Sequence, residues 1–440
     1  MQTQNETNLP HVVIVGGGAG GLELATKLGK KLGKKNKARI TLIDKNRVHI
    51  WKPLLHEVAT GSLDTEIDGV VYRAHSARHS YHFQLGAVES IDRESKKLQL
   101  AQIVDESGDV IVDQRTLSYD TLVLAIGSIS NDFGTPGIQQ HCYMLDSRLQ
   151  AQNFQKRLLN QFLHKSQQAQ SLETITPTRL AIVGAGATGV ELSAELNHVV
   201  DVVRIYDIDN NQGQPLNIDL IEAGPRILPA LPEKIAESAA AELEKLNVNI
   251  HTSTMITEAN EKGFITSDGT TIEADLMVWA AGVKAQNWLS KIGLEVNRIN
   301  QIICHRTLKS SVDESIYAIG DCCHVEMEDG SKVPPRAQSA HQMASTVASN
   351  IIRELNNKTL KEFTYTDYGS LVNLSRFSTV GSLMGNLVKG SMFIEGKIAR
   401  VMYLSLYRMH QLAIHGYIKG PFIIFLSRIS KIIRPKIKLH

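Results

Sequence analysis

The sequence predicts an α/β chain with two Rossmann-like dinucleotide-binding domains, followed by an amphipathic C-terminal region that anchors to a membrane. Three observations support this prediction. A glycine-rich turn follows a short apolar strand near residue 16, and a turn of the same spacing follows another strand near residue 184. Strands alternate with helices around both turns, as in doubly wound domains with parallel sheets. The chain ends in a segment that combines apolar and basic side chains.

The expected elements follow from apolar runs and their flanking turns. A long polar helix is expected over Leu145–Ala169, and a helix rich in small residues after Pro334 and Pro335. Strands are also expected at His11–Val15, Thr121–Gly127 and Arg179–Gly184. Further strands are expected to end at Asp44, Glu222, Gly282 and Asp321, and helices are expected at Ala19–Leu32 and from the second glycine turn to Val199.

The first glycine turn has the G-x-G-x-x-G spacing, at Gly16, Gly18 and Gly21. The first glycine permits the tight turn, the second lets the backbone approach a pyrophosphate, and the third lets helix and strand pack closely. The free N–H groups at the helix start favour an anion. Asp44 ends the next strand, where a carboxylate can accept hydrogen bonds from a ribose. A tight turn without a ligand is the alternative, and the strand–turn–helix–acid order argues against it.

The second turn repeats the motif at Gly184, Gly186 and Gly189, and Glu222 ends the strand that follows. A carboxylate at that point binds the ribose hydroxyls and repels a 2′-phosphate, which favours NADH over NADPH. Arg226 lies nearby and either softens this preference or is only a surface residue. Two such modules usually hold a resident FAD in the first and a diffusible NADH in the second, although spacing alone does not prove that order.

Composition and charge narrow the class of protein. Hydrophobic residues make up 42% of the 440 residues and charged residues 21%, which is ordinary for a globular chain. The polar N-terminus lacks the features of a signal peptide, and no apolar run is long enough for a transmembrane helix. Residues 389–440 carry a charge of +9, so the rest of the chain, whose total is +2, carries −7. An acidic body with a basic, apolar tail favours an anionic membrane surface over nucleic acid.

The tail itself has helical periodicity. Apolar residues from Phe422 to Ile433 fall on one helical face, and Arg428, Lys431 and Arg434 follow one another at three-residue steps on another. This pattern is typical of an amphipathic helix that lies in the headgroup region of a bilayer. A homodimer interface, or a helix docked on the body of the protein, is the alternative.

The four cysteines, Cys142, Cys304, Cys322 and Cys323, contain no CxxC pair, so the sequence encodes neither a zinc site nor a redox-active dithiol. We expect Cys322 and Cys323 to be small buried residues. No group of His, Cys and carboxylates has the spacing of metal ligands, so no metal is expected.

Several longer motifs resemble one enzyme family. The two glycine turns, with the strand ending in IYAIGD, resemble the two-dinucleotide-binding-domain flavoproteins. HIWKPLLHEVATGSL from His49, NDFGTPG from Asn131, WAAGVKA from Trp279 and PPRAQSAHQ from Pro334 resemble type II NADH:quinone oxidoreductases, which are single-chain and do not pump protons. The resemblance covers nearly the whole chain.

The resemblance implies roles for further residues. Asp321 of the GD pair is expected at the ribityl chain of FAD, and the superfamily's ATG turn is similar to Ala125–Gly127, where Ile126 replaces the threonine. Gly127 and Gly282 are expected at the cofactors. The implied domains are residues 1–140 with 303–350 for FAD, 141–302 for NADH, and 351–440 for membrane association. The AQxAxQ motif of the family's quinone pocket matches Ala337, Gln338, Ala340 and Gln342.

The glutamines of the AQxAxQ motif and Glu191 each have an alternative interpretation. Gln338 and Gln342 are four residues apart and share a helix face, where an amide can bind a quinone oxygen and small alanines leave room for a flat ring. Ordinary buried amides are the alternative. The resemblance places Glu191 near the flavin and nicotinamide, where it is expected to orient the nicotinamide or deliver a proton. The alternative is an acid in the first turn of a helix, stabilised by the helix dipole.

The sequence therefore predicts electron transfer from NADH through FAD to a membrane quinone, either ubiquinone or menaquinone, in a respiratory chain. By resemblance, the protein is expected peripherally on the cytoplasmic side of the bacterial inner membrane. A sulfide:quinone oxidoreductase and a flavoprotein redox sensor remain as alternatives, and a disulfide reductase lacks its dithiol.

Overall fold

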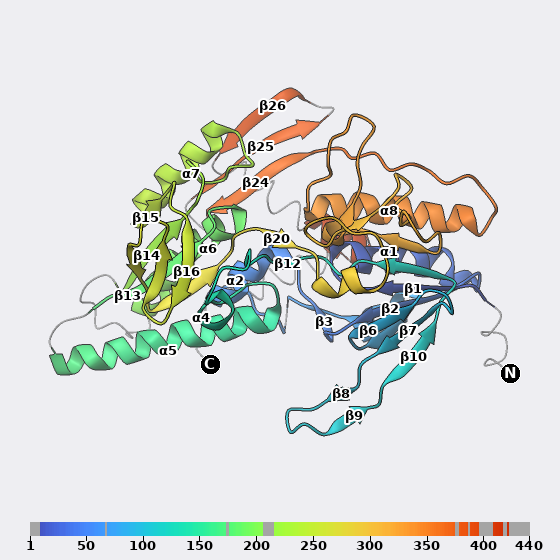
Figure 1. Ribbon diagram of the computed structural model, residues 1–440, viewed down its shortest axis with the longest axis horizontal. Coiled ribbons are helices and arrows are strands. Elements are labelled where there is room, and N and C mark those ends of the chain that lie inside the picture. The colour runs from blue at the N-terminus through green and yellow to red at the C-terminus, as the bar shows by residue number, and fades with distance from the viewer. Residues whose placement is uncertain are drawn as a thin grey trace. The chain divides into compact units, whose positions relative to one another are not determined.

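The computed structural model describes residues 9–66, 68–172, 176–205, 215–374, 378–385, 388–395, 408–416 and 420–421 (Figure 1). The chain forms two compact units. Unit 1 comprises Met1–Trp51, Gly69–Ile129 and Val283–Tyr365, and unit 2 comprises Lys52–Asp68, Ser130–Gly282 and Thr366–His440. Each unit contains one of the two glycine turns, so the repeated sequence pattern corresponds to a repeated fold.

Unit 1 is built on a five-stranded parallel sheet in the order β22-β11-β1-β2-β5. Its central strand, with the sequence HVVIV, is buried along its whole length, as expected for a parallel strand covered on both faces. Val13 and Ile14 of this strand align with Thr41 and Leu42 on one side and with Leu122 and Val123 on the other. The strands are β1 (His11–Val15), β2 (Arg39–Asp44), β5 (His82–Leu85), β11 (Thr121–Leu124) and β22 (Ile316–Ala318).

Two helices of unit 1, α1 (Ala19–Lys31) and α8 (Ala337–Glu354), lie side by side (Figure 1). Their close approach depends on small residues, because a Cβ atom at Gly20 would lie 3.1 Å from the carbonyl oxygen of Ala340. Helix α3 (Tyr72–His79) also packs on α1, where a Cβ atom at Gly29 would lie 2.2 Å from the carbonyl oxygen of His79.

Unit 1 also contains a smaller antiparallel sheet in the order β10-β7-β6, from which the hairpin β8–β9 extends (Figure 1). The bounds are β6 (Val88–Asp92), β7 (Lys97–Leu100), β8 (Ile103–Val104), β9 (Val110–Val112) and β10 (Arg115–Ser118). The remaining short strands of unit 1 are β3 (Val48–His49), β4 (Val70–Val71), β20 (Val283–Lys284), β21 (Ile302–Ile303) and β23 (Cys323–His324), and β12 (Ile129–Ser130) marks the boundary with unit 2.

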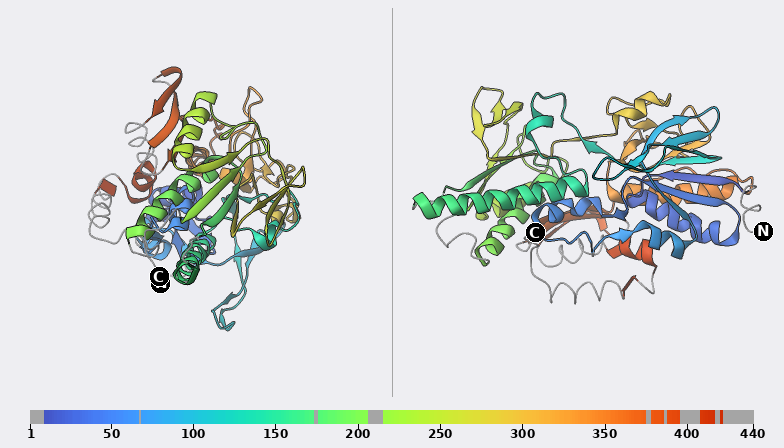
Figure 2. Two further views of the ribbon diagram at one scale, coloured as in Figure 1. Left: turned by 90° about the vertical axis from the view of Figure 1, so that its left-hand side faces the viewer. Right: turned by 90° about the horizontal axis from the view of Figure 1, so that it is seen from below.

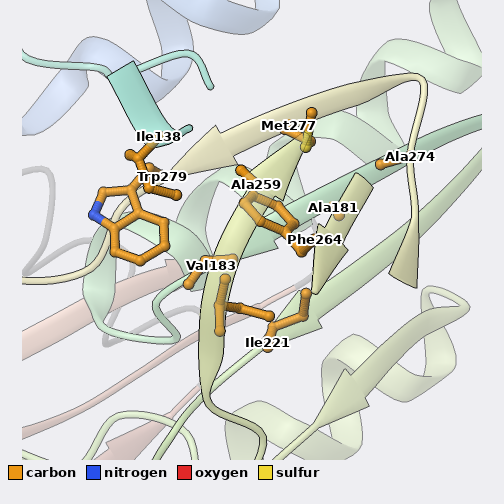
Figure 3. Close-up of a cluster of buried hydrophobic side chains, with 10 residues drawn as sticks. Ile138, Ala181, Val183, Ile221, Ala259, Phe264, Ala274, Met277 and Trp279 are labelled. Carbon is orange, nitrogen blue, oxygen red and sulfur yellow. The ribbon is translucent and has the colours of Figure 1, made fainter. Parts of the chain in front are cut away.

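Unit 2 repeats the parallel architecture with the strand order β15-β14-β13-β19. Next to this sheet, an antiparallel sheet of β16, β17 and β18 closes an apolar core in which Phe264 and Trp279 pack together (Figure 3). The strands are β13 (Thr178–Val183), β14 (Leu216–Ile221), β15 (Val248–His251), β16 (Ile256–Asn260), β17 (Gly263–Thr266), β18 (Thr271–Glu273) and β19 (Leu276–Trp279).

Three long helices pack against the parallel sheet of unit 2 (Figure 2). They are α5 (Arg148–Leu172), α6 (Ala187–Ile205) and α7 (Glu233–Lys245), and the shorter helices of this unit are α2 (Leu55–Thr60) and α4 (Ile138–His141). A second antiparallel sheet contains β24 (Gly369–Leu374), β25 (Ser378–Gly385) and β26 (Val388–Glu395) and contacts α6 and α7.

The compact units differ from the expected domain boundaries at several points. Residues 130–140, expected with the FAD domain, fall in unit 2, whereas residues 283–302, expected with the NADH domain, and residues 351–365, expected in the membrane region, fall in unit 1. Lys52–Asp68 belongs to unit 2, because α2 packs against α5 and α6. Residues 366–395, which we expected in a membrane region, supply the sheet of β24, β25 and β26 to unit 2. The amphipathic helix expected over residues 422–435 lies outside the described residues. Among the helices that the structure describes, none has both the length and the apolar character needed to cross a membrane.

The third glycine of the second turn is expected to stabilise the fold. A Cβ atom at Gly189 would lie 2.0 Å from the carbonyl oxygen of Gly184, whereas one at Gly186 would meet no atom within 4 Å. Gly189→Ala should therefore lower the midpoint of thermal denaturation by roughly 4–8 °C, because forced overpacking costs about 2 kcal/mol. Gly186→Ala is the matched control and should leave the midpoint unchanged, as followed by circular dichroism without NADH. Equal midpoints for the two variants would contradict this account.

Candidate functional site

The first glycine turn joins β1 to α1 and leaves the start of that helix open. Gly16 has a φ of +102°, which favours glycine, and a Cβ atom at Gly21 would lie 1.9 Å from the Gly16 carbonyl oxygen. A Cβ atom at Gly18 would meet nothing within 4 Å, and no side chain caps α1 there. Open space beside uncapped N–H groups matches the needs of a pyrophosphate.

Asp44 lies beside this turn, as predicted. Its Oδ2 accepts a hydrogen bond of 2.7 Å from the Gly17 N–H, and its Oδ1 accepts one of 2.7 Å from the Asn46 N–H. Tyr72 supports the turn from α3, because its hydroxyl donates to the Gly17 carbonyl oxygen at 2.7 Å. Burial, and then the charge of Asp44, raise the pKa of this tyrosine well above its usual value, so it stays neutral. No motif in the sequence singled out Tyr72.

Asp321 follows β22 and is held from two sides. Its Oδ2 accepts a 2.7 Å hydrogen bond from the Ser128 hydroxyl, and its carbonyl oxygen accepts one of 2.8 Å from Gln301 Nε2. Gly127, next to Ser128, has a φ of +69° and open space where a Cβ atom would be. Unit 1 therefore brings Gly16, Gly18, Gly21, Asp44, Gly127 and Asp321 together at the ends of neighbouring parallel strands, where open α/β sheets bind ligands.

Unit 2 repeats the geometry of the first turn. Gly184 also has a φ of +102°, Gly186 faces open space, and Gly189 packs against the Gly184 carbonyl. Glu222 follows β14 and accepts hydrogen bonds of 2.9 Å from the Ala185 N–H and the Gly224 N–H. Gly282 lies after β19 with a φ of +61°, and a Cβ atom there would lie 2.6 Å from the Phe133 ring.

The predicted glutamines lie on α8 in unit 1. Gln338, His341 and Gln342 are half-buried on one side of the helix, at positions i, i+3 and i+4. Ala340 does not lie on that side. It is buried against Gly20, and a Cβ atom at Gly320 would lie 3.4 Å from its own Cβ. The small size of Ala340 therefore serves helix packing, whereas Ala337 is half-buried at the start of α8.

His341, which lies between the two glutamines, is part of a polar network that sequence reasoning missed. Its Nδ1 hydrogen bonds to the carboxylate of Glu23 on α1, and its ring stacks on Trp51 with a centroid separation of 5.5 Å. Lys27 forms a 2.6 Å ion pair with Glu23. Burial alone would raise the pKa of Glu23, but His341 and Lys27 hold it below its usual value. The carboxylate is therefore ionised at neutral pH.

Glu191 lies in unit 2 and is the fifth residue of α6, beyond the first turn of the helix. The alternative reading as a first-turn acid is therefore wrong. Its Oε1 accepts a 3.0 Å hydrogen bond from the Asn373 N–H of β24. The pKa of Glu191 is raised to about 8, mainly by burial, with the hydrogen bond from Asn373 opposing the shift and the charges of Glu57 and Glu195 adding to it. Glu191 therefore carries a proton at neutral pH.

His56 of α2 lies next to Glu191, with 3.6 Å between its Nδ1 and Oε2 of the carboxyl group. Burial lowers the pKa of His56 to about 4, although the charge of Glu195 opposes the shift. Both groups are neutral near pH 7, so this contact is not an ion pair. Glu195 lies one helical turn after Glu191 and accepts a 2.5 Å hydrogen bond from the Ser62 hydroxyl. The motif around His49–Leu63 thus supplies His56 and Ser62 to a cluster around Glu191.

The cysteines behave as expected from the sequence. All four are free thiols, and Cys304, Cys322 and Cys323 are buried. Burial raises the pKa of Cys322 to about 12, and contact with Cys304, followed by burial, raises that of Cys323 well above the usual value. Thiols held neutral in this way are poor nucleophiles. Within the described ranges, no group of three or more His, Cys, Asp or Glu residues could hold a metal ion.

Comparisons with known proteins agree with this geometry. Residues 10–344 match the pyridine nucleotide-disulphide oxidoreductase family. The chain is 47% identical to the type II NADH:quinone oxidoreductase of Haemophilus influenzae, over 98% of this chain and 100% of the relative. Its fold is similar to that of NDH2 from Plasmodium falciparum in complex with NADH, with a TM-score of 0.79 and 20% identity over 98% of this chain and 100% of the other. The sulfide:quinone oxidoreductase of Aquifex aeolicus is more distant, with a TM-score of 0.70 and 17% identity over 96% and 95% of the two chains.

The raised pKa of Glu191 predicts how stability changes with pH. The unfolded chain loses this proton near the usual value of 4.5, whereas the folded chain keeps it to about pH 8. Because the folded state then binds more protons, stability falls as pH rises between these values and levels off above them. Glu191→Gln removes this pH dependence. As pH rises from 4.5 to about 8, the thermal midpoint of the wild type should therefore fall relative to that of the variant. The exposed Glu237→Gln is the control, and a flat difference between wild type and Glu191→Gln would refute the protonated state.

Proposed function

Because this chain belongs to the type II NADH:quinone oxidoreductases and to the pyridine nucleotide-disulphide oxidoreductase family, it transfers electrons from NADH through FAD to a quinone, and we propose how its residues divide this work. Unit 1 holds FAD and unit 2 receives NADH. The observation that carries this proposal is the repeated turn, in which an open helix start lies beside an acid at the end of the next strand. When bound, FAD accepts hydride from NADH and releases two electrons to the quinone.

In unit 1, the N-terminus of α1 binds the pyrophosphate of FAD, Asp44 binds a ribose, and Asp321 contacts the ribityl chain. The support for this assignment is that the Asp44 and Asp321 carboxylates are already held by N–H and hydroxyl donors. Gly127 offers an open backbone position beside Asp321.

In unit 2, Glu222 binds the ribose hydroxyls of NADH and disfavours the phosphate of NADPH. The Arg226 guanidinium donates to the carbonyl oxygens of Leu228 and Pro229, at 3.3 and 3.1 Å. A guanidinium engaged with its own backbone is poorly placed to offset the charge of Glu222, which supports a preference for NADH. Gly282 provides the close backbone approach at the nicotinamide.

The quinone binds along the side of α8 that carries Gln338 and Gln342, whose amides hydrogen bond to its oxygens. Ala337 gives the ring access at the start of the helix, and Ala340 acts indirectly by seating α8 against α1.

Glu191 delivers a proton, or orients the nicotinamide, during turnover. Support comes from its burial and from its pKa of about 8, since a general acid is most effective when its pKa lies near the working pH. Turnover that is the same in Glu191→Gln at every pH would exclude this role.

The chain works as a peripheral protein on the cytoplasmic side of a bacterial inner membrane, in a respiratory chain and without pumping protons. A lipid-soluble quinone and a basic, apolar C-terminal segment support this proposal, since an anionic bilayer surface attracts such a segment. A homodimer formed through the same segment is compatible with it. Nucleic acid is not a partner in this proposal, because the body of the chain is acidic.

The sulfide:quinone alternative is weakened by the thiols, because such an enzyme needs reactive cysteines and three of these are buried, with Cys322 and Cys323 held neutral. A redox sensor would bind NADH without passing electrons to quinone, and the following experiment distinguishes it from an oxidoreductase.

Anaerobic spectroscopy of the purified, flavin-loaded protein separates the two half-reactions. NADH should bleach the flavin spectrum, and a short-chain quinone added afterwards should restore it. Bleaching without recovery on quinone would favour the sensor, and no bleaching by NADH would favour sulfide as the donor.

The glutamines should affect only the second half-reaction. We expect Gln338→Leu and Gln342→Leu each to slow reoxidation by quinone about tenfold, since a lost hydrogen bond costs about 1.4 kcal/mol. Bleaching by NADH should be unchanged in stopped-flow measurements. Gln140→Leu, at an exposed glutamine of unit 2, is the control. Equal slowing of both half-reactions would mean that α8 is disturbed as a whole.

A further inference from the structure

The NDFGTPG segment of unit 2, residues 131–137, carries a side chain that the fold itself does not explain. The Phe133 ring is 65% exposed, and Phe133 is the only phenylalanine among the exposed large apolar side chains of the described residues. Its φ of +52° lies in the left-handed region, which is rare for a bulky residue. An exposed ring and an unfavourable backbone both lower stability, and such strain tends to occur where a protein binds a ligand.

The backbone of this segment is held by the core of unit 2. The Phe133 N–H donates to Asn131 Oδ1 at 3.1 Å, and the Asn131 carbonyl oxygen accepts a 2.8 Å hydrogen bond from Trp279 Nε1. Trp279 belongs to the apolar core of this unit (Figure 3). The next turn is closed by the Thr135 N–H, which donates to the Asp132 carbonyl oxygen at 2.9 Å. The position of Phe133 is therefore set by hydrogen bonds and by the core, and its ring is available for another contact.

The Phe133 ring lies against Gly282, at the end of β19. A Cβ atom at Gly282 would lie 2.6 Å from this ring, so the close approach requires that position 282 has no side chain. The backbone that leads to Gly282 packs on the second glycine turn, since a Cβ atom at Gly184 would lie 2.6 Å from the Ala281 nitrogen. The strand order β14-β13-β19 puts Glu222, which follows β14, and Gly282 on opposite sides of the strand that leads into this turn. The ring therefore flanks the proposed NADH site on the side away from Glu222.

We propose that Phe133 is a binding residue for NADH and that its ring packs against the nicotinamide end of the dinucleotide. This inference rests on the proposed function, in which unit 2 receives NADH and Glu222 binds the ribose of the adenosine end. A dinucleotide bound there crosses the glycine turn, so its other end reaches the β19 side, where Gly282 and Phe133 lie. A flat apolar ring suits the flat nicotinamide, because contact between them removes apolar surface of both from water.

Replacement of Phe133 by asparagine separates a role in binding from a role in folding, because asparagine tolerates a positive φ. Anaerobic stopped-flow bleaching of the flavin-loaded enzyme gives the NADH concentration at which the rate is half-maximal. In Phe133→Asn this concentration should rise roughly tenfold, at the upper end of what one aromatic contact contributes. The inhibition constant of ADP-ribose, which lacks the nicotinamide, should stay within about twofold of the wild-type value. The thermal midpoint should not fall, because the left-handed backbone suits asparagine better than phenylalanine.

Two further variants serve as controls. Lys96 is also exposed and has a φ of +50°, but it lies in the turn between β6 and β7 of unit 1. Lys96→Asn introduces the same side chain at the same backbone geometry and should leave the binding of both NADH and ADP-ribose unchanged. Phe133→Tyr keeps an aromatic ring, so its NADH dependence should stay within about twofold of that of the wild type.

An unchanged NADH dependence in Phe133→Asn would overturn the proposal. Equal weakening of NADH and ADP-ribose would also overturn it, since the variant would then disturb the whole site and not one end. Phe133→Leu is the second variant, in case Phe133→Asn fails to fold, and the same pattern is expected because leucine has no ring to stack on a nicotinamide. A wild-type enzyme that NADH does not bleach would reject the proposed function itself, whereas the other outcomes concern Phe133 alone.

Discussion

The structure depends most on one close approach of backbone to backbone, which occurs once in each unit. The third glycine of each turn packs directly on the carbonyl oxygen of the first, with no room for a side chain at Gly21 or Gly189. This contact fixes where α1 and α6 begin relative to their strands. Once the helix start is fixed, its N–H groups, the open space at Gly18 or Gly186 and the acid of the next strand have defined positions. The geometry of the proposed nucleotide sites is therefore a consequence of how a strand and a helix pack.

Carboxylates near these turns have different roles because their surroundings differ. Asp44 and Glu222 each accept two backbone N–H groups, which hold their carboxyl oxygens in place beside the glycine turns. Glu191 accepts one backbone N–H in a buried setting, and its pKa rises to about 8. The same chemical group is therefore proposed to bind a ribose in one place, and burial raises its pKa in another. The number of hydrogen-bond donors and the access of water to the carboxyl group decide between these two roles.

Local patterns predicted the parallel strands, the glycine turns and the acids beside them, because each depends on residues close in sequence or on strand order. Contacts between distant segments could not be predicted in this way. Ser62 meets Glu195 across 133 residues, and His341 meets Glu23 across 318, with no periodicity to mark either pair. The motif around Glu191 also does not reveal that α6 begins at Ala187, which puts this residue beyond the first turn of the helix. Burial, which sets the pKa of Glu191, arises from α2 and β24 and is invisible in the local sequence.

Helix α8 explains why one short motif contains both alanines and glutamines. The Gly320 N–H contacts Met343 Sδ at 3.2 Å, and Ala340 packs on Gly20 and Gly320, so this side of the helix adjoins the segment that carries Asp321. Any residue larger than alanine at position 340 would push α8 away from α1. The glutamines and His341 lie on a neighbouring side, where Glu23 of α1 and Trp51 orient the imidazole. Packing on one side of α8 therefore sets the position of the polar groups on the other, and a substitution at Ala340 would act on those polar groups without touching a ligand.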